Sequence, residues 1–509
     1  MISIIAGGLT LLALYLLVDN IKSFLLKRKF NCRNAYYVND GWFGFKTFLL
    51  LLQNDRNGTS SENQINNFET VQKDTFQIRM LGSKKIVTRD PENIKAMLST
   101  QFDHFGIGHR YGQLKPLLGE GIFTVSGEKW KHSRAMLRPQ FTREQISHVQ
   151  MLEPHIQNLK KHIMQNSGNP FDIQELLLKF TIDTSSDFLY GESCNSLLED
   201  GSGLNGGVKF KSNFHKSFDY VGKFLRYRAI ANGFYFLVDN SKFRDSIKSI
   251  HHFADYYVKK ALEMPPEELE KATKNKFNLL FELVKETRDP KVLRDLTLNI
   301  LLAGRSTTAA LISFCLYQLA RNPDIWLKLR TEIKNSFGSD EEGDSRIQDI
   351  TFESLKKCEY LRAVINETLR LHPSAPNNYR MATRDTTLPR GGGKDEQSPL
   401  LVRKGEIVLY SAIAMHNNSK IYGESFREFK PDRWFTNDAK HWGWSYLPFN
   451  GGPRVCLGQQ FALTEASYVI ARICMMFSQI ESFESRYPPL TELYLVMFIK
   501  NHNNIVLRI

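Results

Sequence analysis

One short segment near the C-terminus constrains the fold of this chain more than any other feature. Phe449, Gly452, Arg454, Cys456 and Gly458 form the pattern F-x-x-G-x-R-x-C-x-G, directly before a segment with helical periodicity. Backbone N–H groups at a helix N-terminus favour a thiolate and lower the pKa of the thiol. The two glycines let backbone approach the sulfur and a bound group closely. The alternative is a structural cysteine beside a glycine turn, but five fitted positions favour a thiolate ligand.

The composition excludes several classes of protein. The chain has 509 residues, 42% of them hydrophobic, which is enough for one large mixed domain, and it contains no internal repeat. Its net charge of +13 is spread among interspersed acidic and basic residues, so no nucleic-acid-binding block is present. Its 6 cysteines form no C-x-x-C pair, which argues against a zinc site and a disulfide framework.

The N-terminal segment predicts a membrane anchor. Residues Met1 to Val18 carry no charge, apolar character resumes as far as Leu26, and a basic flank follows at 27–29. A cleaved signal peptide is the alternative, although its basic start and cleavage site are not clear here. By the positive-inside rule the remaining chain lies on the cytoplasmic side. We therefore expect an anchor with its basic flank at 1–30, a linker at 31–70 with an apolar segment (Trp42 to Leu52) that is interfacial or packed, and the main domain at 71–509.

Periodicity predicts a mostly α-helical chain with small β-sheets, an α+β fold. A hairpin is expected around the Gly82 turn, and a helix is expected to begin at Asp90 and Pro91. The longest helix should begin at Asp289 and Pro290 and end at Asn322. Further along, another helix should end near Leu371, and residues 389–393 should form a turn between short strands.

The cysteine segment and its continuation, Gln459 to Ala462, resemble the haem-binding loop of cytochrome P-450 enzymes. The resemblance implies haem b, iron protoporphyrin IX, with Cys456 as the ligand of its iron. Phe449 would then cover the thiolate, and Arg454 would meet a haem propionate. It also implies the family's fold, a triangular helical domain with haem between the long central helix and the helix after the cysteine loop.

A second motif of that family lies on the helix before Leu371. Glu367 and Arg370 form its E-x-x-R, and residues at i and i+3 share one helix face. Arg433 resembles the arginine that completes this charged cluster. An isolated E-x-x-R is more often a surface pair. Its order before Arg433 and the cysteine loop favours the structural cluster.

Two further segments resemble propionate-binding positions of the family. Trp130 and Arg134 match its W-x-x-x-R helix, whose indole N–H and guanidinium bind a propionate. Arg380, after the E-x-x-R helix, would be a second propionate partner. For both arginines, the alternative is an ordinary surface side chain.

The long helix carries residues at the place of the family's oxygen-activation motif. Gly304, Thr307 and Thr308 favour a local opening of the helical hydrogen-bond ladder, with room for dioxygen and water. Thr307 would support oxygen activation and relay protons. The alternative is a glycine at a tight helix crossing with threonines packed sideways. Ser306 stands where the family usually has an acid, and serine cannot hold a titrating proton, so activity is less certain than haem binding.

The resemblance extends beyond these motifs to the alkane- and fatty-acid-hydroxylating branch found in yeasts, in residues 121–141, 380–393 and 446–467. It implies a long apolar substrate that is hydroxylated at the terminal, or omega, carbon inside a narrow channel. The candidate wall residues, each of which has a place in the apolar core as its alternative, are Phe105, Phe123, Leu302, Leu495 and Val496.

The resemblance further implies electrons from an NADPH-dependent flavoprotein reductase, and an enzyme held at the endoplasmic reticulum membrane by a single N-terminal anchor. A basic proximal surface including Lys131 would steer an acidic partner, unless that lysine is simply solvated. Two alternatives to a membrane-bound monooxygenase stay open. One is a haem-thiolate isomerase or dehydratase, which would work without reductase or dioxygen, and the other is a haem-binding membrane protein without turnover.

Overall fold

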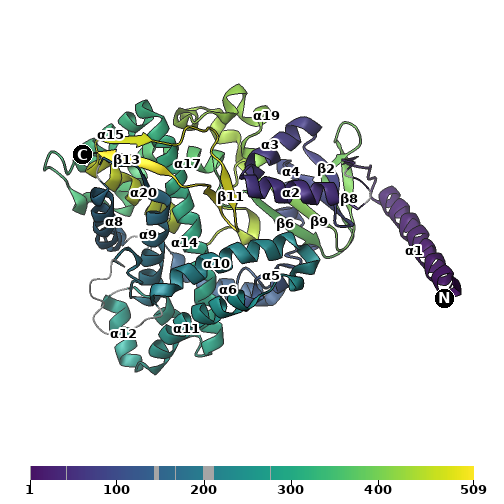
Figure 1. The fold of residues 1–509 in the computed structure, drawn as a ribbon, viewed down its shortest axis with the longest axis horizontal. Helices are drawn as coiled ribbons and strands as arrows, with labels where there is room; N and C mark the ends of the chain where they lie inside the picture. Colours follow the sequence, from purple (N-terminus) through teal and green to yellow (C-terminus); the bar gives the residue numbers. More distant parts are fainter. Residues whose placement is uncertain are drawn as a thin grey trace.

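The computed structural model describes residues 2–39, 41, 43–142, 148–166, 168–198, 211–275 and 277–508. Helices dominate this part of the chain, and the small sheets lie apart: the strands β2, β6 and β9 are near α1, and β13 is near α15 (Figure 1). Its α-helices are α1 (Ile2–Lys29), α2 (Phe45–Asn57), α3 (Ser60–Val71), α4 (Pro91–Lys95), α5 (Arg110–Leu118), α6 (Gly127–Leu137), α8 (Glu153–Gln165), α9 (Ile173–Tyr190), α10 (Lys211–Ile230), α11 (Ser241–Glu263), α12 (Pro266–Asn275), α13 (Leu279–Glu286), α14 (Pro290–Arg321), α15 (Pro323–Phe337), α16 (Phe352–Lys357), α17 (Glu359–Leu371), α18 (Ala412–His416), α19 (Ser419–Tyr422) and α20 (Gln459–Met476). The prediction of a mostly helical α+β chain is confirmed.

Helix α14 contributes residues to both of the large hydrophobic clusters, and its predicted limits are confirmed. The Asp289 side chain caps it by accepting hydrogen bonds from the backbone N–H groups of Lys291 and Val292, and Pro290 occupies the first turn. Helix α14 is long and apolar enough to cross a membrane by composition. Because 72% of its apolar stretch is buried by other elements, it serves as the core helix of the catalytic body.

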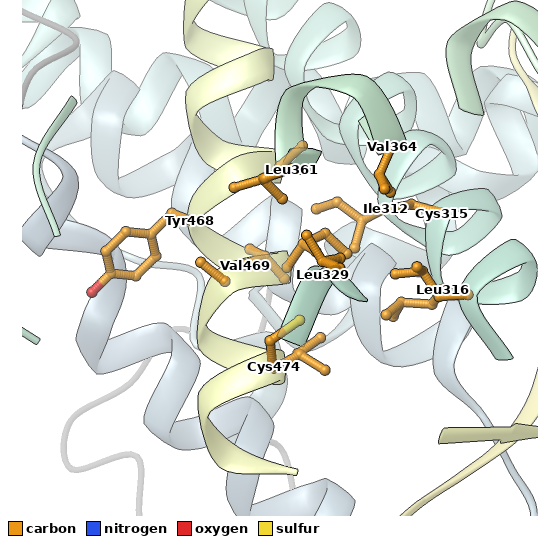
Figure 2. Packing of buried hydrophobic residues seen from close by; sticks show 14 of the residues in the cluster. Ile312, Cys315, Leu316, Leu329, Leu361, Val364, Tyr468, Val469 and Cys474 are labelled. Atoms are coloured by element: carbon orange, nitrogen blue, oxygen red, sulfur yellow. The ribbon is translucent and has the colours of Figure 1, made fainter. Parts of the chain in front are cut away.

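The largest hydrophobic cluster joins α14 to α15, α17 and α20 (Figure 2). Apolar residues on one face of each helix meet at this junction, which places the helix after the cysteine loop against the long helix. The residues at the centre of the junction are Ile312, Cys315, Leu316, Leu329, Leu361, Val364, Val469 and Cys474. A second cluster packs α9, α10, α11 and α13 against the N-terminal half of α14.

The β-structure consists of small sheets. A six-stranded sheet has the order β1 (Tyr36–Tyr37), β2 (Thr75–Met80), β3 (Ser83–Thr88), β9 (Ile407–Ser411), β6 (Asn377–Ala382) and β4 (Phe105–Gly106). The others are β10 (Gln479–Ser482) with β13 (Asn504–Arg508) and β5 (Phe171–Asp172), β11 (Thr491–Leu493) with β12 (Met497–Ile499), and β7 (Thr386–Gly392) with β8 (Ser398–Val402). The predicted hairpin is β2–β3, which turns at Leu81 and Gly82, both at positive φ. The turn expected at 389–393 begins later, because β7 continues through Gly392.

The N-terminal region differs from the expected linker. Helix α1 extends away from the body (Figure 1), and the pairs Lys22–Asp385 and Asp19–Arg403 hold its C-terminal half to the body. Residues 31–70 contain β1, α2 and α3: Phe68 of α3 is buried, whereas α2 has no buried residue and exposes Phe45, Leu49 and Leu50. The apolar segment expected to be interfacial or packed is largely α2, and Trp42 lies outside the described residues.

Candidate functional site

A cavity lies between α14 and the loop that carries Cys456. It is lined by residues from the loop before α6, from α6, α9, α14, β6 and β9, and from the segment before α20. The sequence-predicted residues on its wall are Phe123, Trp130, Arg134, Gly304, Thr307, Thr308, Arg380, Phe449, Arg454, Cys456 and Gly458. Elements more than 300 residues apart in the chain, from Phe123 to Gly458, therefore meet at one site.

The Cys456 thiol is exposed to this cavity and shielded by protein on its other sides. Its backbone N–H donates to the Phe449 carbonyl at 3.0 Å, and Gly458 caps the N-terminus of α20 two residues later. Burial raises the pKa of the Cys456 thiol, while the Gly458 N–H and the charge of Arg134 lower it. The N–H group at the helix terminus thus acts in the expected direction, but desolvation outweighs both lowering groups, so the net shift of this pKa is upward.

The two glycines of the motif have different surroundings. Gly452 has φ +68°, and a Cβ on it would lie 1.8 Å from the Leu98 carbonyl oxygen. Only glycine fits this position. The reason is the neighbouring backbone of Leu98, whereas we expected close approach to the sulfur. A Cβ on Gly458 would meet only the Phe141 ring at 3.7 Å, so that position is sterically open on the protein side.

Four guanidinium groups converge on the cavity, from Arg110, Arg134, Arg380 and Arg454. In the described part of the chain, no ion pair joins any of them to a carboxylate. Burial, together with the charges of Arg380, Arg110 and Arg134, lowers the pKa of Arg454 to about 9. Burial also lowers the pKa of Arg380, which is 2% exposed. Such a cluster is suited to a bound dianion.

Local bonds fix these arginines on the wall. Arg454 donates to the carbonyls of Ile122 at 3.2 Å and Val125 at 2.9 Å, and it stacks on the Trp130 ring with 4.4 Å to the centroid. Arg134 donates to the Val455 carbonyl at 3.1 Å. An apolar cavity with a thiol on one wall and an unpaired arginine cluster on another fits haem, which offers an iron and two propionates to these groups.

Another wall of the cavity is formed by one face of α14, which includes Ala303, Gly304, Thr307 and Thr308. The Thr307 hydroxyl donates to the Ala303 carbonyl at 2.6 Å, and the Thr308 hydroxyl has no partner among the described residues. The expected local opening of the helix is not observed, because α14 is a continuous α-helix through these positions. Instead, Gly304 allows close approach of α9: a Cβ there would lie 3.1 Å from the Ser185 hydroxyl.

Ser306 and Leu302 do not belong to the cavity wall. Both fall between the i, i+3, i+4 positions that face the cavity, and Leu302 packs into the cluster around α9 and α11. Leu495 packs against the same cluster. Val496 is buried with Ala310 and Phe498, and Phe105, in strand β4 of the six-stranded sheet, belongs to another buried cluster. Of the candidate substrate residues, only Phe123 lines this cavity.

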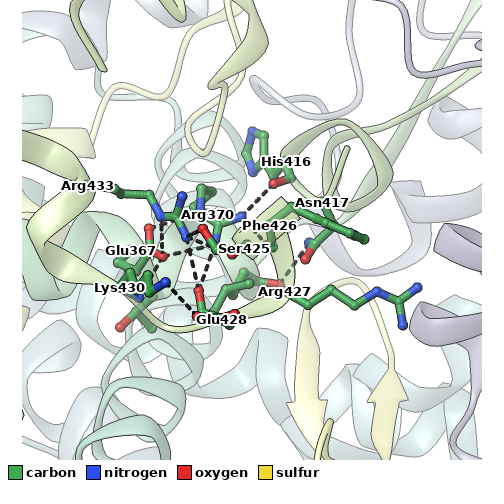
Figure 3. A network of polar contacts seen from close by, with 12 residues as sticks. Glu367, Arg370, His416, Asn417, Ser425, Phe426, Arg427, Glu428, Lys430 and Arg433 are labelled. Atoms are coloured by element: carbon green, nitrogen blue, oxygen red, sulfur yellow. Dashed lines mark hydrogen bonds and ion pairs between the residues drawn. The ribbon is translucent and has the colours of Figure 1, made fainter. Parts of the chain in front are cut away.

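The E-x-x-R pair is fully buried (Figure 3). Glu367 accepts two hydrogen bonds from Arg370 at 2.9 Å and one from the Arg433 Nε at 2.8 Å. The backbone N–H of Lys430 and the indole N–H of Trp434 also donate to this carboxylate. Arg370 donates as well to backbone carbonyls of the 416–428 segment, so the cluster ties α17 to the chain leading to the cysteine loop.

Some wall residues escaped the sequence reasoning. Arg110 lies on the wall but in no recognised motif, and the surrounding sequence, which also contains His109 and Lys115, gives no signal that singles it out. Tyr410 lines the cavity from β9, and its hydroxyl donates to the Asn450 side chain at 3.0 Å. The neutral ring of His416 accepts a hydrogen bond from the backbone N–H of Leu447, and this bond positions the start of the cysteine segment.

Comparison with known proteins places this arrangement in a family. The family model for cytochrome P-450 matches residues 41–507. Cytochrome P-450 52A12 of Debaryomyces hansenii is 51% identical over 486 residues, covering 95% of this chain and 93% of that protein. Cytochrome P-450 52A10 of Candida maltosa is 50% identical over 497 residues, covering 96% and 95%. The resemblance read from the motifs is confirmed, and the chain belongs to the cytochrome P-450 family of haem-thiolate monooxygenases.

Proposed function

We propose that this enzyme hydroxylates long-chain alkanes, fatty acids or both at the terminal, or omega, carbon. The observation that carries the proposal is the cavity itself: a thiol and an α14 hydroxyl face one cavity whose lining, apart from the arginine cluster, is mostly apolar. The apolar wall includes Ile122, Phe123, Phe188, Leu189 and Ile300. Such a wall binds a hydrocarbon chain by excluding water and offers no polar anchor near the reacting carbon.

The residues have distinct roles in this proposal. Bound haem supplies the redox-active iron at which dioxygen is activated for insertion into a C–H bond. Cys456 would bind the metal as thiolate, and the arginine cluster with Trp130 would hold the propionates. Thr307 can hold and pass a proton at its Oγ1, because a hydroxyl both donates and accepts. Ser306 lies off the wall, so it can act only through other groups or water.

Electrons require a redox partner, which we propose to be an NADPH-dependent flavoprotein reductase. Lys131, on α6 beside the cavity wall, has an exposed side chain paired with Glu128 at 2.7 Å and belongs to the surface offered to that partner. We further propose that residues 1–30 anchor the enzyme in the endoplasmic reticulum membrane, with residues 71–509 on the cytosolic side. The three basic residues that end α1 support this orientation.

Product analysis tests the substrate proposal. The purified enzyme, reductase and NADPH are incubated with hexadecane or hexadecanoic acid, and NADPH consumption is compared with product formed. We expect terminal alcohol in proportion to NADPH consumed. Turnover without reductase or dioxygen would instead indicate an isomerase or dehydratase, and a normal haem spectrum without product would indicate a haem-binding protein.

A further inference from the structure

The loop at 119–126, between α5 and α6, carries Ile122 and Phe123 onto the cavity wall. Two side chains of α14, one helical turn apart, hold this loop. Asp295 accepts a hydrogen bond from the Glu120 backbone N–H at 2.9 Å, and Asn299 accepts one from the Phe123 backbone N–H at 3.2 Å. Both side chains are buried, with Asp295 1% and Asn299 0% exposed. A backbone donor of the substrate-facing residue is thus satisfied by the long helix.

The loop lies directly against these side chains. The Asn299 amide also donates to the Leu118 carbonyl at 2.9 Å, so it bonds the chain on both sides of the bend. A Cβ on Gly121 would lie 2.3 Å from the Asn299 amide nitrogen, and one on Gly119 would lie 2.0 Å from the Asp295 carboxylate. A Cβ at either glycine would therefore have to displace the loop or the α14 side chain that it meets.

The opposite side of the loop is tied to the cysteine segment. Arg454 donates to the Ile122 and Val125 carbonyls, while the same guanidinium belongs to the arginine cluster of the cavity. The 119–126 loop is therefore held between the helix that forms one cavity wall and the segment that forms the other. The position of the Phe123 side chain depends on both contacts.

We propose that Asn299, supported by Asp295, is a positioning residue that sets which carbon of a chain substrate reacts. This inference rests on the proposed hydroxylation of apolar chains. Such a substrate has no polar group near its reacting end, so the apolar wall must decide how far the end enters. The hydrogen bond from the Phe123 N–H to Asn299 fixes that wall at the required position.

The test compares Asn299→Ala with Thr297→Ala in the full-length, haem-loaded enzyme. Thr297 is a matched control because it is buried on the same helix and its hydroxyl bonds to the Leu293 carbonyl of that helix. We expect Asn299→Ala to speed hydrogen exchange in the 119–126 peptide by about tenfold or more, the effect of losing one buried hydrogen bond. We also expect a lower ratio of terminal to subterminal alcohol. Thr297→Ala should leave both quantities as in the wild type.

A double-mutant cycle keeps the test independent of general destabilisation. Gly121→Ala alone should displace the loop, because its Cβ meets the Asn299 amide. In the Asn299→Ala background, Gly121→Ala should lower the ratio of terminal to subterminal alcohol by less than it does in the wild type, because the Asn299 amide that its Cβ meets has been removed. Additive effects of the two substitutions would argue against direct contact as the cause.

The outcomes separate this inference from the proposed function. If the wild type hydroxylates chains but Asn299→Ala keeps the wild-type product ratio and loop exchange, the positioning role is overturned and the proposed function stands. If the wild type forms no hydroxylated product from either substrate, the proposed function fails, and the selectivity role fails with it.

Discussion

Replacing the Glu367 carboxylate by an amide of the same shape should destabilise the whole haem-binding body. In Glu367→Gln, the volume is kept, but two guanidinium groups lose their shared negative partner. Arg370 and Glu367 are 0% exposed, and the side chain of Arg433 is 10% exposed, so water cannot replace the lost charge. The amide also presents N–H groups toward donors that now meet a carboxylate oxygen.

The size of the effect follows from this burial. Removing one partner of a buried ion pair costs about 3–5 kcal/mol, because the remaining charge stays desolvated. Total stabilities of folded domains are about 5–15 kcal/mol. The substitution should therefore remove a large share of the stability. Since the cluster ties α17 to the segment before the cysteine loop, haem incorporation should fall with it.

Urea unfolding and the yield of haem-loaded protein measure this effect. Glu128→Gln is the control, because it removes a carboxylate from an exposed i,i+3 pair with Lys131 and should change neither quantity measurably. If Glu367→Gln unfolds within about 1 kcal/mol of the wild type, the assignment of this cluster as a buried electrostatic tie is refuted.

Four further expectations concern the cavity and the pH dependence. Thr307→Ala should keep haem binding but lower product formed per NADPH by about 10²-fold if its hydroxyl relays protons, as coupled turnover would show. Ser306→Asp should raise coupled turnover if proton delivery is limiting, and an unchanged rate would place delivery on another route. Arg380→Gln should speed haem transfer to apomyoglobin, because one buried guanidinium leaves the arginine cluster. Burial and the charge of Arg370 lower the pKa of His372 to about 3, so its contribution to stability is present above the unfolded pKa of about 6.5 and is lost as pH falls toward 3. By pH 5 this loss should be about 2 kcal/mol in urea unfolding, and His372→Gln should show a shallower acid slope.

Sequence patterns were sufficient where local chemistry sets the structure. The limits of α14 followed from the Asp289 cap and Pro290, and the β2–β3 turn followed from Gly82. The spacing in the Cys456 segment was enough to identify the family. The order of the E-x-x-R pair and Arg433 before that segment favoured a charged cluster, and the structure joins Glu367 to both arginines. These features depend on spacing along the chain, which a sequence displays directly.

Features that depend on tertiary packing could not be read in the same way. The wall role of Arg110 arises only when α5 is folded beside β6, where its guanidinium donates to Asn378 at 2.6 Å. Leu495 and Phe105 are apolar residues that pack into the core, and sequence alone cannot tell a core position from a cavity wall. The link between Asn299 and the backbone of Phe123 joins residues 176 positions apart, which no local pattern reveals.

The bond between the Cys456 sulfur and the haem iron is the central claim of this account, and absorption spectroscopy tests it most directly. The reduced, carbon-monoxide-bound spectrum is recorded for the wild type and for Cys456→Ser. The account predicts the red-shifted Soret band of a thiolate-bound haem in the wild type and its loss in the variant. A variant that keeps the wild-type band would contradict the account.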